Sequence, residues 1–389
     1  MSFNYAGLMD LSSLTFNTVQ GYNMSTGFSY YKRNEDRGKR TEIRADINYG
    51  FSEDRIRATG RFYHQFNNQN YSNISILGGT KVEQFNSNEP ISSFINTSST
   101  LFFKSNYMKL YNLEFIRLNY GQDVANGINI NGKMEYVQRK PLFNTTDYTI
   151  IKNDIPYTSN NPLDENDNLN PGFEKHNLVK IVLNARINFG NKYYSRPDGK
   201  FNFRNEKYPT LFFGYEKGIA ASDKKYEFEH LSTRVFYDIN MGNKGNLALN
   251  LKSGKFFNAN NIAFMDYKHF NGNQTHIGGT DRYLNVFNFM PYYTNSTNES
   301  YFEAHIEHND RGFFTNKIPL INKLKSTLII GFHQLAVPNR IPYTEYTIGL
   351  DNLGFGKFKL FRLDYIRSYQ NGYIGDGVIF GLKILNALD

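Results

Sequence analysis

The chain has 389 residues and a net charge of +8, with 44 basic residues interspersed among 36 acidic ones. It contains no Cys, which excludes disulfides, thiol nucleophiles and Cys-ligated metal centres. No apolar run approaches the roughly 18 residues that a membrane-spanning helix needs. The 34 Phe and 29 Tyr argue against intrinsic disorder, because so aromatic a chain can bury a large surface. The mixed charges indicate solvated faces rather than a nucleic-acid-binding stripe.

Apolar and polar residues alternate with a period of two over long segments. The pattern is clear in residues 42–49, 55–62 and 178–189, and it returns in residues 361–384. Such alternation is typical of strands with one apolar and one polar face. Many of these segments have about ten residues, the length that a tilted strand needs to cross a bilayer. Because only closure satisfies every backbone group in lipid, the pattern predicts a transmembrane β-barrel.

In chain order, the expected strands occupy approximately residues 2–9, 13–20, 22–32, 40–50, 54–66, 111–121, 126–139, 178–190, 208–218, 227–241, 244–256, 299–309, 325–336, 342–352, 357–369 and 376–386. The fold class is therefore all-β: a transmembrane antiparallel barrel of about 16 strands (range 14–16), forming one domain over residues 1–389. A soluble β-sandwich or propeller shares the alternation, but the chain has no repeat at the period of about 40–50 residues that a propeller needs.

The connections between the expected strands alternate in length. Tight turns are expected at Gly21, 50–53, 121–125, 242–243 and 353–356, and long loops at 67–110, 140–177 and 257–298. Short turns on one side and long loops on the other are typical of outer-membrane barrels, whose short side faces the periplasm. Two connections on the short side, 191–207 and 310–324, are longer than this rule predicts.

Several sequence blocks are spread over nearly the whole chain. They include 17–21 (NTVQG), 48–54 (NYGFSED), 195–200 (SRPDGK), 269–274 (HFNGNQ), 316–321 (NKIPLI) and 362–365 (RLDY). In these blocks the chain resembles a bacterial outer-membrane β-barrel family of unknown function, usually preceded by a periplasmic carboxypeptidase-regulatory-like domain. The resemblance implies this fold and an outer-membrane location, and it supplies no reaction or catalytic residue. Since the preceding domain is missing, we expect an isolated barrel or part of a longer precursor.

The motif His305-Ile306-Glu307-His308 invites comparison with a zinc hydrolase. A zinc site of the H-E-x-x-H type needs two His four residues apart on one helix face. On a strand, by contrast, His305 and Glu307 share a face and His308 points the other way. We therefore expect no metal site, no cofactor and no catalytic residue.

The polar faces of the strands hold the remaining functional signal. The candidates for lumen-facing residues are Arg44, Arg55, Arg57, Arg61, Arg186, Arg362 and Asp364. A barrel of about 16 strands is wide enough for an aqueous channel or a plugged lumen. The charges could line a pore, or they could pair with one another and hold the barrel shut. Because residues 257–298 are rich in apolar groups for an exposed loop, we expect them to fold inward.

These observations predict a non-enzymatic outer-membrane β-barrel that serves as a structural or assembly component of the cell envelope, with a filled lumen. The alternatives are a porin-like channel for small solutes and an outer-membrane hydrolase. The expected partners are membrane lipid and other outer-membrane or periplasmic proteins, and nucleic acid is not expected.

Overall fold

The computed structural model describes residues 1–6, 14–34, 38–151, 154–196, 199–278, 283–319, 321–356 and 358–382. The chain divides into two compact units. Unit 1 comprises Met1–Arg204, Gly214–His230 and Phe257–Tyr267, and unit 2 comprises Asn205–Phe213, Leu231–Phe256 and Lys268–Asp389. Eighteen strands in the described part of the chain belong to a single sheet. The prediction of an all-β fold is therefore confirmed.

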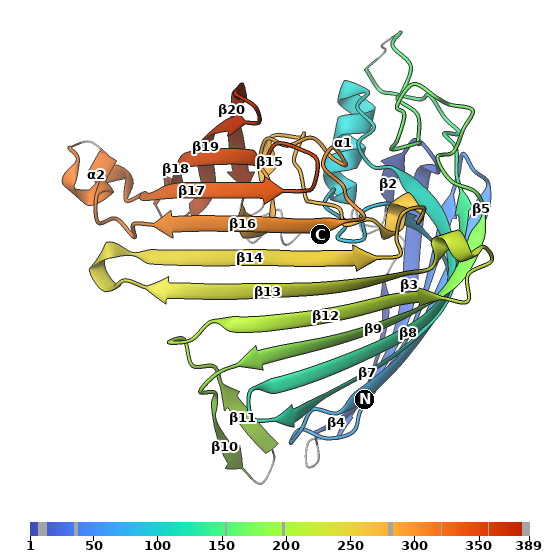
Figure 1. The fold of residues 1–389 in the computed structure, drawn as a ribbon, viewed down its shortest axis with the longest axis horizontal. Helices are drawn as coiled ribbons and strands as arrows, with labels where there is room; N and C mark the ends of the chain where they lie inside the picture. Colours follow the sequence, from blue (N-terminus) through green and yellow to red (C-terminus); the bar gives the residue numbers. More distant parts are fainter. Residues whose placement is uncertain are drawn as a thin grey trace. The chain divides into compact units, whose positions relative to one another are not determined.

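The strands of unit 1 are β1 (Ser2–Ala6), β2 (Leu14–Asn17), β3 (Gly21–Asn34), β4 (Lys39–Gly50), β5 (Arg55–Gln65), β6 (Asn73–Gln84), β7 (Leu110–Ala125), β8 (Ile128–Pro141) and β9 (His176–Asn188). From β3 to β9 each strand pairs antiparallel with the next one in the chain. Figure 1 shows β7, β8 and β9 side by side. Both β1 and β2 pair with β3. Unit 1 also contains helix α1 (Ser93–Phe103) and a separate hairpin of β10 (Lys192–Arg196) and β11 (Gly199–Phe203).

The strands of unit 2 are β14 (Asn246–Phe257), β16 (Ser300–Asn309), β17 (Thr327–Ala336), β18 (Tyr343–Phe355), β19 (Phe358–Tyr369) and β20 (Tyr373–Leu382). They pair antiparallel in this order, and the short strand β15 (Ile277–Gly278) pairs parallel to β20. Strands β12 (Thr210–Ile219) and β13 (Phe228–Asn240) have residues in both units, and Phe257, the last residue of β14, belongs to unit 1. The remaining helices are η2 (Lys224–Tyr226), η3 (Gly242–Lys244), η4 (Phe264–Asp266), η5 (Tyr283–Asn285), η6 (Thr315–Lys317) and α2 (Ile321–Leu324).

The expectation of a long loop at 67–110 is wrong, because this stretch contains β6 and α1. The pair Gly78-Gly79 suggests a turn in the sequence, yet both glycines lie inside β6. Gly79 has φ +136°, and a Cβ there would lie 2.1 Å from the carbonyl oxygen of Ala58 on β5. Gly79 is therefore needed where the backbone of the neighbouring strand approaches closely.

The additional strand β6 also changes which turns lie at the same end of the sheet in unit 1. The turn at 50–55 lies at the end that carries α1 and residues 142–175, which we call the loop end. The turn at 126–127 and the β10–β11 hairpin lie at the opposite end, which we call the turn end. The expectation that both tight turns lie on one side is therefore wrong, because one more crossing separates them.

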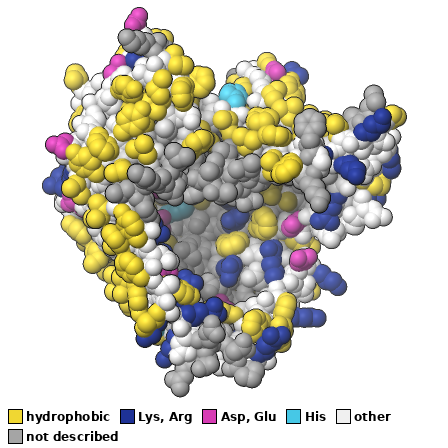
Figure 2. Space-filling view, turned by 180° about the vertical axis from the view of Figure 1, so that it is seen from behind, with side chains coloured by type: hydrophobic (Ala, Val, Ile, Leu, Met, Phe, Trp, Pro, Cys, Tyr) yellow, Lys and Arg dark blue, Asp and Glu magenta, His cyan; other side chains and the backbone are white. Residues whose placement is uncertain are grey.

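The two faces of the sheet in unit 1 follow the predicted alternation. Cross-strand register places Ile47, Phe62, Ile76, Leu118 and Met134 on one continuous face. These side chains are between 39% and 54% exposed. Figure 2 shows hydrophobic side chains over wide areas of the surface. An exposed apolar surface of this extent marks a membrane or partner contact. We call this surface the apolar face and the opposite one the polar face.

A small core lies on the polar face at the loop end of unit 1. Phe85 packs edge-on against Tyr111 and Phe173, with ring centroids 5.4 and 5.7 Å apart. The Tyr157 hydroxyl donates to the Thr100 carbonyl of α1 at 2.8 Å. Residues 142–151, residues 154–175 and α1 are thus held on the polar face by ordinary core packing. Within the described residues, no helix is long and apolar enough to span a membrane.

The facing of β9 leads to a first prediction. Leu183 is 50% exposed on the apolar face, and its neighbour Asn184 lies opposite Asn131 on the polar face. Leu183→Arg should destabilise the membrane-inserted form by roughly 2–4 kcal/mol, the cost of Arg on a lipid-facing position near the bilayer midplane. Asn184→Arg should be tolerated. Heat-modifiable migration on gels after outer-membrane extraction measures assembly of both variants, and equal damage would mean that the faces are assigned wrongly.

Candidate functional site

The five candidates of unit 1 lie on its polar face. Arg362 and Asp364 lie on the face of β19 opposite the 44% exposed Leu363, which we call the polar face of unit 2. The seven residues differ in exposure and in pairing. Arg44 and Arg61 are exposed; Arg44 pairs with Asp46 at 2.8 Å, and Arg61 lies over the Tyr63 ring. Arg186 is exposed as well. Arg55, Arg57, Arg362 and Asp364 are held in ion-pair networks.

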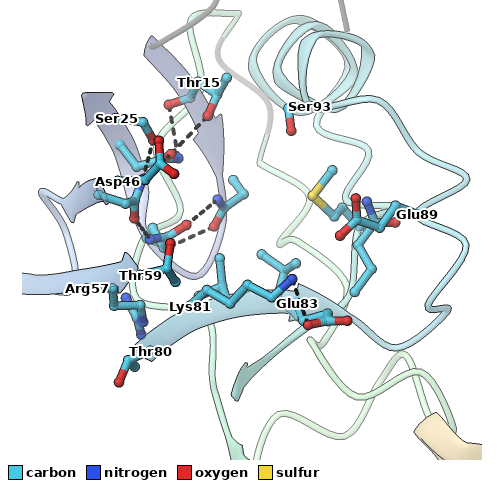
Figure 3. Close-up of a pocket in the computed structure, with 18 of the residues that line it drawn as sticks. Thr15, Ser25, Asp46, Arg57, Thr59, Thr80, Lys81, Glu83, Glu89 and Ser93 are labelled. Atoms are coloured by element: carbon cyan, nitrogen blue, oxygen red, sulfur yellow. Dashed lines mark hydrogen bonds and ion pairs between the residues drawn. The ribbon is translucent and has the colours of Figure 1, made fainter. Parts of the chain in front are cut away.

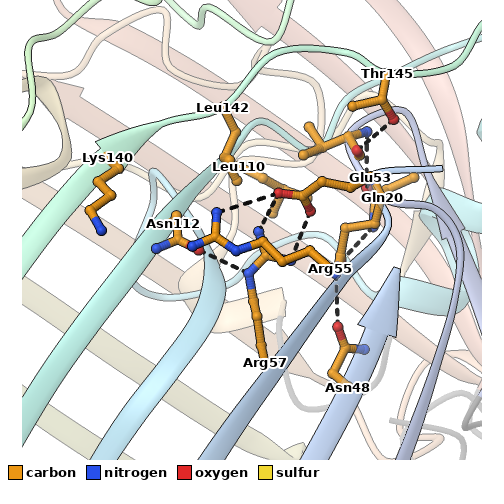
Figure 4. Close-up of polar contacts among 12 residues, drawn as sticks. Gln20, Asn48, Glu53, Arg55, Arg57, Leu110, Asn112, Lys140, Leu142 and Thr145 are labelled. Carbon is orange, nitrogen blue, oxygen red and sulfur yellow. Dashed lines mark hydrogen bonds and ion pairs between the residues drawn. The ribbon is translucent and has the colours of Figure 1, made fainter. Parts of the chain in front are cut away.

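The Arg57 network lies at the loop end of unit 1 (Figure 4). Its guanidinium donates to both carboxylate oxygens of Glu53, at 2.7 and 2.6 Å, and to the side-chain oxygen of Asn112 at 2.9 Å. Arg55 lies 3.8 Å from the same carboxylate. Glu53 occupies the turn between β4 and β5, so the turn folds its carboxylate back over the first residues of β5. Two of the candidate lumen-facing arginines, Arg55 and Arg57, are therefore paired with one Glu.

The Arg362 network lies on β19 of unit 2. The guanidinium donates to Glu307 at 2.8 Å and to Asp364 at 2.7 Å, and it lies 3.6 Å above the ring of Tyr283. Tyr283 belongs to η5, in the segment between β14 and β16. Strand charges in unit 2 are thus neutralised by one another and covered by an aromatic side chain from a loop.

A second charged cluster, which the sequence analysis missed, lies in unit 1. Asp266 of η4 is fully buried and accepts hydrogen bonds from both terminal nitrogens of Arg139 and from Lys180. Lys180 also lies 2.5 Å from Glu216. Burial raises the pKa of Asp266, but the charges of Arg139 and Lys180 outweigh it and hold the pKa well below the ordinary value. The sequence contains one signal of this cluster, a single Asp inside the apolar stretch 262–267.

The segment between β14 and β16 packs on the polar face of unit 2. Phe287 and Met290 are 0% and 1% exposed, and the Phe287 ring lies 4.7 Å from His305 and 5.8 Å from Tyr343. The Glu345 carboxylate accepts from the backbone N–H groups of Asn288 and Phe289 at 2.7 and 2.8 Å. This apolar-rich segment therefore packs against the sheet strands of unit 2, and its inward folding into a lumen stays a prediction.

Glycines of β20 make room for this segment. A Cβ on Gly377 would lie 2.6 Å from the Phe289 ring, and a Cβ on Gly381 would lie 2.3 Å from the Tyr283 hydroxyl. The parallel bridge from β15 to Phe380 and Gly381 adds backbone pairing at the same place. Rings from the segment thus rest directly on the strand backbone.

The His305 motif forms part of a buried polar chain. His305 bonds through one ring nitrogen to His333 at 2.8 Å and through the other to Glu303 at 2.7 Å. Lys252 pairs with Glu303 at 2.9 Å. His308 instead contacts the Lys244 carbonyl at 2.9 Å. Among the described residues no cluster of His, Cys, Asp or Glu could hold a metal ion.

A cavity of about 320 Å³ lies on the polar face of unit 1 (Figure 3). Side-chain amides form a chain along its wall: Asn17 donates to Gln20 at 3.1 Å, Gln20 to Asn48 at 2.7 Å, and Asn48 to Asn23 at 3.3 Å. Asp46, Arg57, Lys81 and Glu83 also line it. Because Asn48 belongs to this chain of amides, the substitution Asn48→Arg would break several hydrogen bonds.

Residues 1–350 match the C-terminal domain of a family of unknown function, DUF5686. The chain belongs to this family. The recognition of a family of unknown function from the sequence blocks is thereby confirmed. None of the curated proteins matches the sequence of this DUF5686 domain.

Three solved structures are similar to the DUF5686 domain over most of its length. BamA from Haemophilus ducreyi lacking POTRA domains 1–3 has 10% identity and a TM-score of 0.49, covering 97% of this chain and 68% of that one. CdiB from Acinetobacter baumannii has 11% identity and a TM-score of 0.42, covering 97% and 57%. A mutant porin from Rhodopseudomonas blastica has 11% identity and a TM-score of 0.33, covering 97% and 96%.

Proposed function

We propose that this DUF5686 domain is a non-enzymatic transmembrane β-barrel in the bacterial outer membrane, one domain of about 16 strands. It acts as a structural or assembly component of the envelope, and its own chain fills the lumen. Membrane lipid and other outer-membrane or periplasmic proteins are its partners.

The number of strand positions supports the barrel size. Of the eighteen described strands in the sheet, β1 and β2 share one position beside β3, and β15 is a two-residue bridge on β20. Sixteen full positions remain. Most of these strands have 10 to 16 residues, enough to cross a bilayer at a tilt. The exposed apolar face is the surface that such a barrel turns toward lipid.

The packing of the segment between β14 and β16 carries the proposal of a filled lumen. In unit 1 this segment places Asp266 between Arg139 and Lys180, and in unit 2 it places Phe287 against His305 and Tyr343. In a barrel the polar face lines the lumen. A segment bonded to that face through buried charges occupies space that a channel would leave open.

The burial of His305 supports a non-enzymatic role. His305 is 0% exposed, and both its ring nitrogens already have partners in Glu303 and His333. A general base must reach the proton that it abstracts, and a substrate has no access to a ring in this position.

Planar-bilayer recording of the purified protein tests the lumen state. We expect no steady conductance, because in this proposal the segment between β14 and β16 fills the lumen. Steady anion-selective conductance, weakened by changing Arg55, Arg57 and Arg61 together to Ser, would contradict the filled lumen and support the porin-like channel.

Cross-linking in native outer membranes tests the assembly role separately. We expect reproducible cross-links to other envelope proteins, identified by mass spectrometry. Cross-links confined to the chain itself would contradict an assembly role, whatever the conductance.

A further inference from the structure

The β10–β11 hairpin presents an aromatic face to solvent. Register places Tyr194, Phe201 and Phe203 on the same side of the hairpin. The ring of Tyr194 stacks on those of Phe201 and Phe203, with centroids 5.3 and 5.1 Å apart. The three side chains are nevertheless 40%, 38% and 50% exposed. Large apolar rings gathered in the open in this way mark an interaction surface.

Cations accompany these rings. The Arg196 guanidinium lies 4.9 Å from the Tyr194 ring centroid and 5.3 Å from that of Phe201. Lys192 lies opposite Phe203 in the register and is exposed. Residues 192–204 contain four basic residues and one acidic residue. The surface is therefore both aromatic and cationic, which favours an anionic partner with an apolar part.

The hairpin is held in place at the turn end of unit 1, where Figure 1 shows it below the ends of β7 and β9. The Lys200 backbone N–H donates to the Asn68 carbonyl at 3.2 Å, and the Tyr71 hydroxyl donates to the Lys200 carbonyl. Asn202 donates to Asp123 at 3.2 Å. A two-stranded hairpin alone is marginal in water, so these contacts fix its position while the aromatic face stays open.

Exposed apolar side chains also lie at the turn end of unit 1, beside the hairpin. Val124 at the end of β7 is 48% exposed, and Phe189, directly after β9, is 46% exposed. In the proposed barrel these side chains face lipid near the membrane surface. Aromatic rings concentrate at that level of a membrane, and Lys and Arg there bind anionic headgroups.

We propose that the aromatic face of the β10–β11 hairpin docks on the phospholipid headgroups of the periplasmic leaflet. The rings of Tyr194, Phe201 and Phe203 enter the headgroup region, while Arg196 and Lys192 bind lipid phosphates. This inference rests on the proposed membrane barrel. A lipid surface accounts for the rings, the cations and the neighbouring apolar strand ends together, whereas an acidic protein would account for the cations alone.

The absence of Trp from the chain makes a direct test possible. Phe203→Trp places the only indole of the protein on the hairpin. The variant is reconstituted in vesicles of phosphatidylcholine with phosphatidylglycerol, and its fluorescence is quenched either by lipids brominated at shallow or deep acyl positions or by aqueous acrylamide. Leu183→Trp and Asn184→Trp are matched controls on the apolar and polar faces of β9.

Strong quenching of the Phe203→Trp variant by the shallow bromolipid and weak quenching by acrylamide would support the docked hairpin. The fluorescence of Leu183→Trp should be quenched most by the deep bromolipid. That of Asn184→Trp should be quenched by neither the shallow nor the deep bromolipid. If Leu183→Trp responds but Phe203→Trp is quenched only by acrylamide, the hairpin proposal fails while the barrel stands. If Leu183→Trp does not respond, the barrel itself fails.

The role of charge is tested in the Phe203→Trp background by changing Lys192 and Arg196 to Gln. Each cation near an anionic surface is worth roughly a fivefold change in occupancy. Bromolipid quenching should therefore rise with phosphatidylglycerol in the parent and lose this dependence in the variant. Quenching that is independent of anionic lipid in both, or that needs an added acidic periplasmic protein, would overturn phosphate binding by these residues.

Discussion

Replacing residues 269–296 by a two-residue Asn-Gly turn is expected to convert a non-conducting protein into one with a steady, porin-sized conductance. The replaced segment includes Phe287 and Met290, which are buried against the polar face of unit 2. Its removal exposes Glu303, Glu345 and Arg362 to water. Planar-bilayer recording of both proteins measures the change.

The ends of the deletion are chosen for their geometry. Lys268 and Thr297 form an antiparallel bridge, with N–H to O distances of 2.8 and 3.1 Å in the two directions. Asn-Gly is the favoured two-residue connection between such a pair. Asp266 precedes the deletion, so the cluster with Arg139 and Lys180 is kept.

Deletion of the exposed β10–β11 hairpin is the matched control, and it should leave the protein closed. Heat-modifiable migration verifies that both deletion variants are folded. A folded 269–296 deletion without conductance would show that this segment does not close the lumen. Equal conductance in the parent would contradict the filled lumen altogether.

Asp266→Ala is expected to destabilise the protein by about 3–5 kcal/mol, because it leaves Arg139 buried without its counter-charge and removes one of the two carboxylate partners of Lys180. The side chains of Arg139 and Lys180 are only 4% and 13% exposed. Asp46→Ala is the matched control: Asp46 is 38% exposed and pairs with Arg44, which is 54% exposed, so its loss should cost about 1 kcal/mol or less. Urea unfolding in detergent, followed by circular dichroism, compares the variants.

The pH dependence of the Asp266 effect has a definite sign. The pKa of Asp266 in the folded protein lies well below the ordinary value, while an unfolded Asp has a pKa of about 3.9. Its contribution is therefore fully present above about pH 4 and is lost as the pH falls toward the folded value. The stability difference between parent and Asp266→Ala should narrow below pH 4. A difference that grows on acidification would show that Asp266 is not a charged partner of Arg139.

The local alternation of the sequence is sufficient to predict β4, β5 and β9 and their two faces. In β4, β5 and β9 the apolar residues, among them Ile47, Phe62 and Leu183, are the exposed ones on one face. This succeeds because successive side chains on a strand point to opposite faces whatever the neighbouring strands are. The same local logic places Arg57 and Arg362 on the polar face.

The boundaries of strands and turns are less predictable where contact with a neighbouring strand determines the backbone conformation. Gly78-Gly79 has the composition of a turn, but the close approach of Ala58 from β5 requires glycine inside β6. Similarly, β1 and β2 share one edge of β3, which residues 2–20 by themselves do not reveal. Both features depend on pairing that local sequence does not encode.

The sequence by itself determined the β class, the apolar and polar faces and the family, because these follow from local periodicity and from residue blocks. Only the tertiary structure decided which charges pair. Asp266 meets Arg139 across 127 residues of chain, and Glu345 meets the backbone of Asn288 across 57. Such contacts depend on the path of a loop over a sheet and on the register of many strands, and no property of either residue alone specifies its partner.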